Sequence, residues 1–116
     1  FGDVARFAIR YAGEGFAVYP LLRESIAAHE EEYRRLPQNA AIFLPGGAVP
    51  RLGARLVQAD LARSLEYMVQ EERRAAPRGR EAGLAAARDA FYRGDLAREI
   101  VRYVRAEGGF LAADDL

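Results

Sequence analysis

Apolar residues recur along most of the chain at the spacing of one face of an α-helix. The first such pattern predicts an amphipathic helix with Asp3 as its N-cap and with Gly13 and Gly15 at its end. Positions i, i+3, i+4, i+7 and i+8 give its expected buried face, which consists of Val4, Phe7, Ala8, Tyr11 and Ala12.

A second helix is expected to begin at Pro20, where the missing N–H of proline costs nothing, and to end before Pro37. Its expected buried face consists of Leu22, Ile26, Tyr33 and Leu36. A short helical turn is expected at residues 40–43. Residues 45–53 form a predicted Gly/Pro loop, and the following Leu56-Val57 is predicted to be an extended crossing that joins no sheet.

Three further helices are expected in the second half of the chain. The first begins at an N-cap Asp60 and is broken by Pro77 and Gly79. Its expected buried face consists of Leu61, Leu65, Met68 and Val69. The next covers residues 82–90 and runs toward Phe91-Tyr92, with Gly94 in a left-handed C-terminal position.

Asp95 is the expected cap of the last helix, which Gly108-Gly109 should stop. Its apolar side consists of Leu96, Ile100, Tyr103 and Val104. The pattern as a whole predicts an all-α fold of about five helices in an irregular array joined by Gly/Pro loops. At most one very short extended segment is expected, and residues 1–116 are expected to form a single helical domain.

Composition excludes several classes of partner and chemistry. The 17 basic residues, all arginine, balance 17 acidic residues, so no net field would attract nucleic acid or an anionic membrane. Charged residues interrupt every apolar run before it reaches the roughly 20 residues that span a bilayer. The chain has no cysteine, which excludes disulfides, thiolate metal sites and cysteine nucleophiles. Localisation cannot be inferred from these features.

The residues that could carry chemistry are isolated from one another along the chain. His29 lies near the stripe of Ile26 and Tyr33 without a second histidine, so it is interpreted as a structural residue. Ser25 and Ser64 lie in helices and lack the Gly-x-Ser-x-Gly turn of a nucleophile elbow.

Two acidic runs also fail as sites. Glu30, Glu31 and Glu32 are consecutive helical residues that spread around the axis and cannot converge on one ion. Asp114-Asp115 is interpreted as a helix cap and not as an acid/base pair.

Residues 70–83 hold the densest charge. Its arginines alternate with acidic residues that largely cancel the local field, so a solvated, partly mobile loop is predicted in preference to a binding patch. The residues concerned are Arg73, Arg74, Arg78 and Arg80 with Glu71, Glu72 and Glu81.

Four blocks in order give the chain a recognisable signature. They are Ala8 to Val18, Phe43 to Gly47, Gly53 to Leu65, and Phe91 to Gly94 together with Gly109 to Leu116. They are similar to the patterns A-I-x-x-A-x-x-G-F-x-V, F-L-P-x-G, G-x-x-L-x-Q-P-D-L-A-x-T-L and the C-terminal motif of the γ-glutamyltranspeptidase family. On these residues the chain resembles a helical part of that family's large subunit.

The chain departs from the family pattern at a few positions. Tyr19 replaces the usual Ser or Thr before Pro20, Ala59 replaces a proline and Ser64 a threonine. Residues 70–83 also form a longer connection than the family has. These changes affect local geometry and not the resemblance itself.

The resemblance implies a γ-glutamyltransferase or γ-glutamyl hydrolase that acts on glutathione-like substrates. In that family a threonine at a new N-terminus attacks the γ-glutamyl amide, with its own α-amino group as the base. This chain contains no threonine. We therefore expect a non-catalytic segment of a larger N-terminal nucleophile enzyme, with no catalytic, cofactor-binding or metal-binding residue and no cofactor.

The expected partners are the rest of the large subunit and the small subunit of the parent enzyme, with no nucleic acid and no membrane. Family members are often periplasmic or extracellular. An exposed apolar patch, detectable as a homodimer of the isolated segment, is also expected. Two alternatives stay open: the helical part of a related cephalosporin or glutaryl acylase, and a stand-alone helical interaction module.

Overall fold

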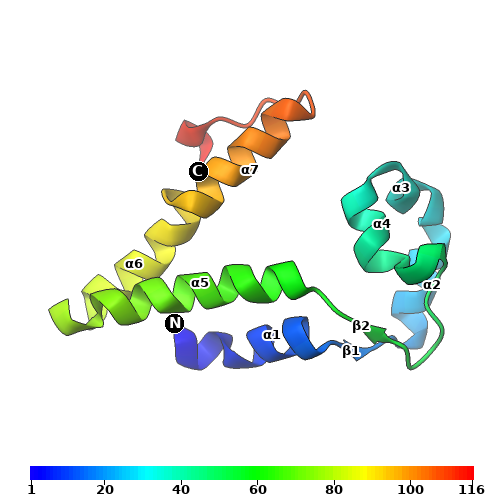
Figure 1. Cartoon of the computed structure of the whole chain (residues 1–116), viewed down its shortest axis with the longest axis horizontal. Coiled ribbons are helices and arrows are strands. Elements are labelled where there is room, and N and C mark those ends of the chain that lie inside the picture. Colours follow the sequence, from blue (N-terminus) through cyan, green and yellow to red (C-terminus); the bar gives the residue numbers. More distant parts are fainter. The chain divides into compact units, whose positions relative to one another are not determined.

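The computed structural model describes residues 1–116 and is predominantly helical, which confirms the predicted fold class. Figure 1 shows helices joined by short connections and one small pair of strands. The α-helices are α1 (Gly2–Glu14), α2 (Pro20–Ala28), α3 (Glu30–Arg35), α4 (Pro37–Phe43), α5 (Ala59–Ala75), α6 (Arg80–Tyr92) and α7 (Asp95–Ala106). The strands are β1 (Phe16–Ala17) and β2 (Arg55–Leu56), and the 3-10 turns are η1 (Pro45–Gly47), η2 (Ala76–Arg78) and η3 (Ala113–Asp115).

The chain divides into two compact units, each with its own packing. Unit 1 comprises residues 1–9 and 63–116, and unit 2 comprises residues 10–62. The boundary falls within α1 and within α5, so each of these two helices contributes residues to both units.

The core of unit 2 gathers large side chains from segments that are distant in sequence. Val18, Ile26, Leu44 and Leu56 are buried together. Tyr33 and Phe43 stack beside them, with ring centroids 4.6 Å apart. Each large side chain buried in this way contributes about 1.5–3 kcal/mol relative to exposure, so this cluster is the main source of stability in unit 2.

A two-stranded ladder closes one side of this core and corrects the prediction that Leu56 would join no sheet. Phe16 pairs antiparallel with Leu56, and Ala17 pairs with Arg55. Val18 extends the ladder, because its N–H donates to the Ala54 carbonyl at 2.8 Å. Strands of two residues carry almost no periodic signal, so the hydrophobic pattern alone could not reveal this pairing.

The helix predicted between Pro20 and Leu36 is interrupted at His29. Two helices, α2 and α3, therefore stand where one was expected, and this is one reason why the structure has more than the predicted five or so helices. His29 has φ −117° and ψ 24°, and it ends α2 and precedes α3. Leu22, Ile26 and Tyr33 still lie on the inner side as predicted, whereas Leu36 is 41% exposed. The short helix expected at residues 40–43 begins earlier, at Pro37.

Unit 1 is held together by small side chains. The buried positions of α6 are Gly83, Ala87 and Ala90. A Cβ on Gly83 would lie 3.2 Å from the Glu72 carbonyl oxygen, so α6 and α5 approach closely here. Within unit 1, η2 joins the ends of α5 and α6, and the C-terminal tail returns to contact α7 through η3 (Figure 1).

Residues 70–83 form two helical ends and a tight turn, which overturns the prediction of a partly mobile loop. Helix α5 continues to Ala75, η2 covers Ala76–Arg78, and α6 starts at Arg80. Pro77 and Gly79 do end the first helix as predicted, but only three residues of 3-10 turn and one glycine separate it from the next. Alanine, arginine and glutamate are strong helix formers, and their propensity extends both helices toward the break.

The three predicted aspartate N-caps lie inside their helices: Asp95 is the first helical residue, and Asp3 and Asp60 are each the second. Asp3, Asp60 and Asp95 each belong to the first turn of their helix. A carboxylate in the first turn still interacts favourably with the helix dipole. The aspartates therefore correctly indicated where the helices begin, but none of them is the N-cap residue itself.

Gly94 does not adopt the predicted left-handed conformation. Its φ is −94° and its ψ is −154°, and it precedes α7 as the N-cap. A Cβ at this position would lie 2.7 Å from the Ala90 carbonyl oxygen. Close approach of α6, and not a positive φ, therefore requires glycine here.

The predicted inner face of α1 is wrong at most of its positions. Val4 is 85% exposed, Phe7 52% and Tyr11 57%, whereas Ala12 is buried as expected. The buried positions of α1 are the smaller residues Ala5 and Ala12. The expected face of α5 is partly right, since Val69 is buried, Leu65 and Met68 are half-buried, and Leu61 is exposed.

The glycine that ends α1 gives a direct test of this packing. We expect Gly15→Ala to lower the free energy of unfolding by about 1–3 kcal/mol, because Gly15 has φ +76°. Its Cβ would also meet Val57 Cγ2 at 2.7 Å and the Leu56 carbonyl oxygen at 2.8 Å. Urea unfolding of the 116-residue chain measures the change.

Gly46→Ala is the matched control, because Gly46 also has a positive φ but its Cβ would have no neighbour within 4 Å. Its cost should reflect the backbone alone and be smaller than that of Gly15→Ala. Equal losses for the two variants would show that the close approach of β2 contributes nothing.

Candidate functional site

His29 and Ser25 lie one helical turn apart and form a local structural contact. The His29 ring Nδ1 lies 2.9 Å from the Ser25 backbone carbonyl oxygen, and both residues are exposed. The ring therefore contacts the backbone at the end of α2 and makes no hydrogen bond to the serine hydroxyl. This arrangement fits the interpretation of His29 as a structural residue, because a nucleophile–base pair needs contact between the two side chains.

Ser64 lies in α5 and is half-buried. Neither the Ser64 hydroxyl nor the Ser25 hydroxyl lies in a turn between a strand and a helix, as a nucleophile elbow requires. These two positions therefore lack the geometry of a serine nucleophile.

The run of glutamates in α3 forms a helix start and no metal centre. Glu30, Glu31 and Glu32 occupy the first turn, where they favour the helix dipole, and Glu30 pairs with Arg34 one turn later. The Arg34 guanidinium also donates to the Gly47 carbonyl at 2.7 Å and ties α3 to η1. No three or more His, Cys, Asp or Glu side chains of this structure come together in a way that could hold a metal ion.

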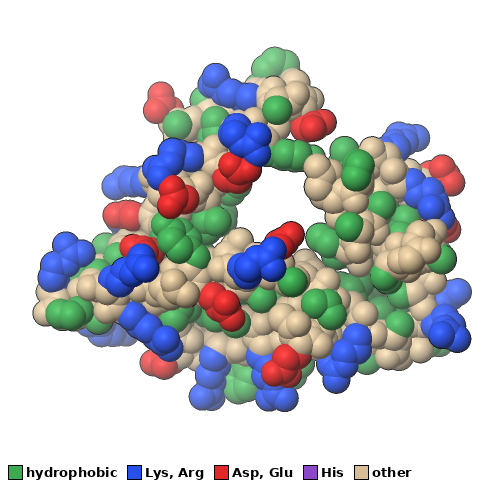
Figure 2. All heavy atoms as spheres, in the orientation of Figure 1, with side chains coloured by type: hydrophobic (Ala, Val, Ile, Leu, Met, Phe, Trp, Pro, Cys, Tyr) green, Lys and Arg blue, Asp and Glu red, His purple; other side chains and the backbone are tan.

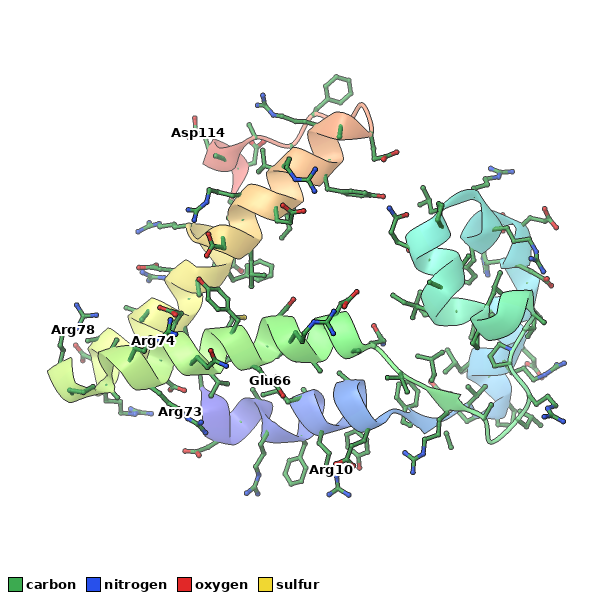
Figure 3. All side chains as sticks on the ribbon, viewed as in Figure 1. Arg10, Glu66, Arg73, Arg74, Arg78 and Asp114 are labelled. Carbon is green, nitrogen blue, oxygen red and sulfur yellow. The ribbon has the colours of Figure 1, made fainter.

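The two C-terminal aspartates belong to a 3-10 turn. The Asp115 carboxylate accepts a hydrogen bond from the Ala112 N–H at 2.7 Å, which stabilises the start of η3. Asp114 is exposed on the same turn, as Figure 3 shows. Asp115 thus caps its own turn, and no partner for acid/base chemistry lies beside it among the hydrogen bonds of this tail.

The arginines of residues 70–83 lie around the end of α5 and the turn η2 (Figure 3). Arg74 pairs with Glu71 within α5, and Arg78 is exposed on the turn. Figure 2 shows acidic and basic side chains interspersed over the visible face of the chain. The interleaved signs agree with the predicted cancellation of the local field.

Arg73 and Arg80 line a surface cavity of about 750 Å³ in unit 1 together with Arg6, Asp3 and Glu72. The floor of this cavity is organised by the Glu72 carboxylate. It accepts a hydrogen bond from the Gly2 N–H at 2.7 Å and, in the 116-residue chain, pairs with the free amino group of Phe1. The Glu72 carboxylate is therefore already engaged by a backbone donor, and the cavity presents mixed charge to solvent.

Hydrogen bonds lower the pKa of the Glu72 carboxyl in this cavity. In the 116-residue chain, the free amino group of Phe1, followed by the Gly2 N–H, stabilises the charged form and lowers the pKa of Glu72 below its usual 4.5, whereas partial burial opposes the shift. Structural ion pairs also perturb pKa values, so this shift alone does not mark a functional site. Glu72 instead ties the start of α1 to α5, which is a structural role.

A second, more apolar hollow of about 470 Å³ lies along α7 in unit 1. It is lined by Tyr92, Ala97, Val101 and Ala113 together with the arginines Arg93, Arg98 and Arg102. Each arginine has an acidic neighbour: Asp89 lies 4.0 Å from Arg93, Asp95 pairs with Arg98, and Glu99 pairs with Arg102. The hollow therefore offers apolar contact area beside arginines that already have acidic partners.

None of the helices combines the length and apolar character that crossing a bilayer requires.

The structure brings together no constellation of nucleophile, base and oxyanion donors from the residues that the sequence singled out. Sequence reasoning did not identify the Glu72 contact, because a carboxylate that binds backbone N–H groups seventy residues away leaves no local pattern.

Comparison with known proteins supplies a context for this arrangement. A family model described as gamma-glutamyltranspeptidase matches residues 1–116. Acylase ACY 1 proenzyme of Pseudomonas sp. (strain SE83) is 35% identical over 98% of the chain, and glutathione hydrolase proenzyme of Escherichia coli (strain K12) is 29% identical over 97%. The chain spans 18% and 17% of the lengths of these two relatives.

Solved structures share the same arrangement of helices. A structure of LmbA2991 superposes with a TM-score of 0.85 at 30% identity and includes 99% of this chain, which covers 21% of that protein. The Bacillus anthracis transpeptidase enzyme CapD superposes with a TM-score of 0.68 at 27% identity. The superposition covers 99% of this chain and 33% of the CapD chain. The described fold thus recurs as a minor part of larger chains.

The Glu72 contact predicts a pH-dependent contribution to stability. In the 116-residue chain, where Phe1 carries a free amino group, we expect Glu72→Gln to lower the free energy of unfolding at pH 7 by less than about 1 kcal/mol, because the pair is partly exposed. The folded-state pKa of Glu72 is lowered, so the contribution is fully present above pH 4.5 and is lost as the pH falls through the folded-state value. Urea unfolding at pH 7 and pH 3 measures the difference.

Glu24→Gln is the matched control, since Glu24 is exposed in the middle of α2. A deficit for Glu72→Gln that has the same size at both pH values would contradict the ionic origin of the contact.

Proposed function

We propose that this chain, which belongs to the gamma-glutamyltranspeptidase family, forms a non-catalytic helical portion of a larger enzyme that transfers or hydrolyses γ-glutamyl groups. The observation that carries the proposal is the ratio of lengths. The chain matches its relatives over 93–98% of its own residues but over only 15–19% of theirs. A segment that occupies so small a share of a proenzyme is expected to contribute shape and contacts to it.

The chemistry assigned to the parent enzyme needs groups that this chain lacks. An N-terminal nucleophile enzyme of this family uses a threonine hydroxyl to attack the γ-glutamyl amide, while the α-amino group of that threonine accepts the proton. The acyl group then passes to water or to an acceptor amine. The chain has no threonine, so the nucleophile of the proposed parent lies outside these residues.

The described side chains support a structural role in the proposed parent. The hydroxyls of Ser25 and Ser64 lie within helices, and the ring of His29 contacts a backbone carbonyl. The carboxylates of Glu72 and Asp115 accept backbone N–H groups. His29, Glu72 and Asp115 contact the backbone in this way near helix ends, which suits a wall beside an active site.

A second candidate is an acylase of the same family. Identity to Acylase ACY 1 is 35%, compared with 29% to the Escherichia coli glutathione hydrolase and 32% to the YwrD proenzyme of Bacillus subtilis. These values differ too little to choose the acyl group. The substrate is instead determined by groups that grip the acyl chain, which in both candidates lie outside the segment.

A test of the parent activity uses the complete polypeptide. It should release p-nitroaniline from γ-glutamyl-p-nitroanilide, and replacing the proposed N-terminal threonine by alanine should reduce kcat on the order of 10³-fold or more. The 116-residue chain alone should give no turnover. Faster cleavage of a glutaryl amide than of the γ-glutamyl amide would favour the acylase, and a gene without the threonine would favour a stand-alone helical module.

The local candidates give a separate test. In the complete polypeptide we expect Ser25→Ala and His29→Ala to leave kcat within about twofold of the unchanged enzyme, because neither side chain meets a catalytic partner. Steady-state kinetics with γ-glutamyl-p-nitroanilide measures both variants. A loss of 10²-fold or more in kcat, with an unchanged melting temperature, would show that the assignment of no catalytic residue is mistaken.

A further inference from the structure

Helix α1 carries an apolar face that the described chain leaves uncovered. The helix runs unbroken from Gly2 to Glu14, so its own geometry, at about 100° per residue, fixes which side chains share a face. Val4, Phe7, Ala8 and Tyr11 fall within one arc about 100° wide, and we call this set the α1 outer face. All four residues are exposed.

The other two arcs of α1 have different partners. The small residues Ala5 and Ala12 are buried on a second arc. The third arc is polar and includes Arg10, which pairs with Glu14 at 3.0 Å. An amphipathic helix needs only one apolar arc, so a second arc of larger side chains indicates a second packing surface.

The size of the outer-face side chains makes their exposure informative. Burying a Val or Phe side chain contributes about 1.5–3 kcal/mol relative to exposure. The free energy that burial of this face would add is therefore a large fraction of the net stability of a small domain. The Arg6 guanidinium lies 4.5 Å from the Phe7 ring centroid and gives the face a polar margin. Contiguous apolar surface with a polar margin is typical of an interaction site.

We propose that the α1 outer face docks on the remainder of the same polypeptide in the complete protein, which rests on the proposed function. The relatives are about five to six times as long as this chain, so a parent of similar length would have enough further polypeptide to provide the partner surface. The partner surface is expected to be apolar, because the face offers no charged group at its centre.

A second copy of the chain fits this face less well. The two rings of Phe7 and Tyr11 can bury on the order of 300–500 Å² in total, and part of that area is already covered. A stable interface between separate chains needs roughly 800 Å² from each partner. A segment joined covalently to its partner does not lose independent translational freedom, so a small apolar face suffices for it.

The chain has no cysteine, which allows a direct measurement of accessibility. Val4→Cys places a thiol at the centre of the outer face, and Arg10→Cys places one on the polar arc of the same helix. Each variant of the complete polypeptide is reacted with a maleimide, and the labelling rate at that position is followed by peptide mass spectrometry. Tyr11→Cys is a second probe of the face, in case Val4→Cys impairs folding.

The proposal predicts that the thiols introduced at positions 4 and 11 are labelled at least about tenfold more slowly than the thiol at position 10 in the monomeric complete polypeptide. Equal rates at the three positions would overturn it. Protection that appears in the 116-residue chain and rises with its concentration would assign the face to a second copy and would also overturn it.

Enzyme activity separates this proposal from the proposed function. An active complete polypeptide with fast labelling at position 4 would leave the proposed function intact and reject the docking face. Protection at position 4 in a complete polypeptide that cleaves neither amide would retain the docking face and reject the proposed function.

Discussion

Close approach of small side chains is the constraint on which most of this structure depends. Seven of the twelve buried apolar residues are alanines, so helices come near one another but each contact removes little area from water. Gly83 and Gly94 extend the same principle, since a Cβ at either position would meet a backbone carbonyl of a neighbouring helical segment. Large buried side chains are concentrated instead in the core of unit 2, where Val18, Ile26, Leu44 and Leu56 meet.

This distribution of apolar area leaves several large apolar side chains exposed on a predominantly helical chain. Phe110 is 97% exposed and Val4 85%, although both belong to apolar patterns that burial would reward. Other polypeptide that covers Phe110 and Val4 in the complete protein would explain why both are exposed in this chain. The proposed catalytic machinery would then lie in that other polypeptide, and these helices would hold its surroundings in shape.

The helical periodicity of the sequence predicted the fold class because amphipathic spacing is strong over ten or more residues. It could not predict the break at His29, where a single residue leaves helical geometry, or the pairing of Phe16 with Leu56 across forty residues. Local patterns carry no information about such long-range contacts. The same limit hid the hydrogen bonds of Glu72 to the start of α1.

The face of α1 shows a different kind of error. The spacing of Val4, Phe7 and Tyr11 correctly indicated a surface suited to burial, but the described chain buries Ala5 and Ala12 instead. If the α1 outer face docks as proposed, this spacing reflects a contact with polypeptide outside the described residues. The absence of catalytic and metal-binding residues stays a prediction, and the structure adds that the His29 ring contacts the Ser25 backbone carbonyl.

Amide hydrogen exchange tests the central claim most directly, because it compares every helix in the complete polypeptide and in the 116-residue chain. The account predicts that the amides of α1 exchange at least about tenfold more slowly in the complete polypeptide, since its outer face is then covered and local opening costs more. Identical protection of α1 in both forms, together with cooperative unfolding of the 116-residue chain as a monomer, would contradict it.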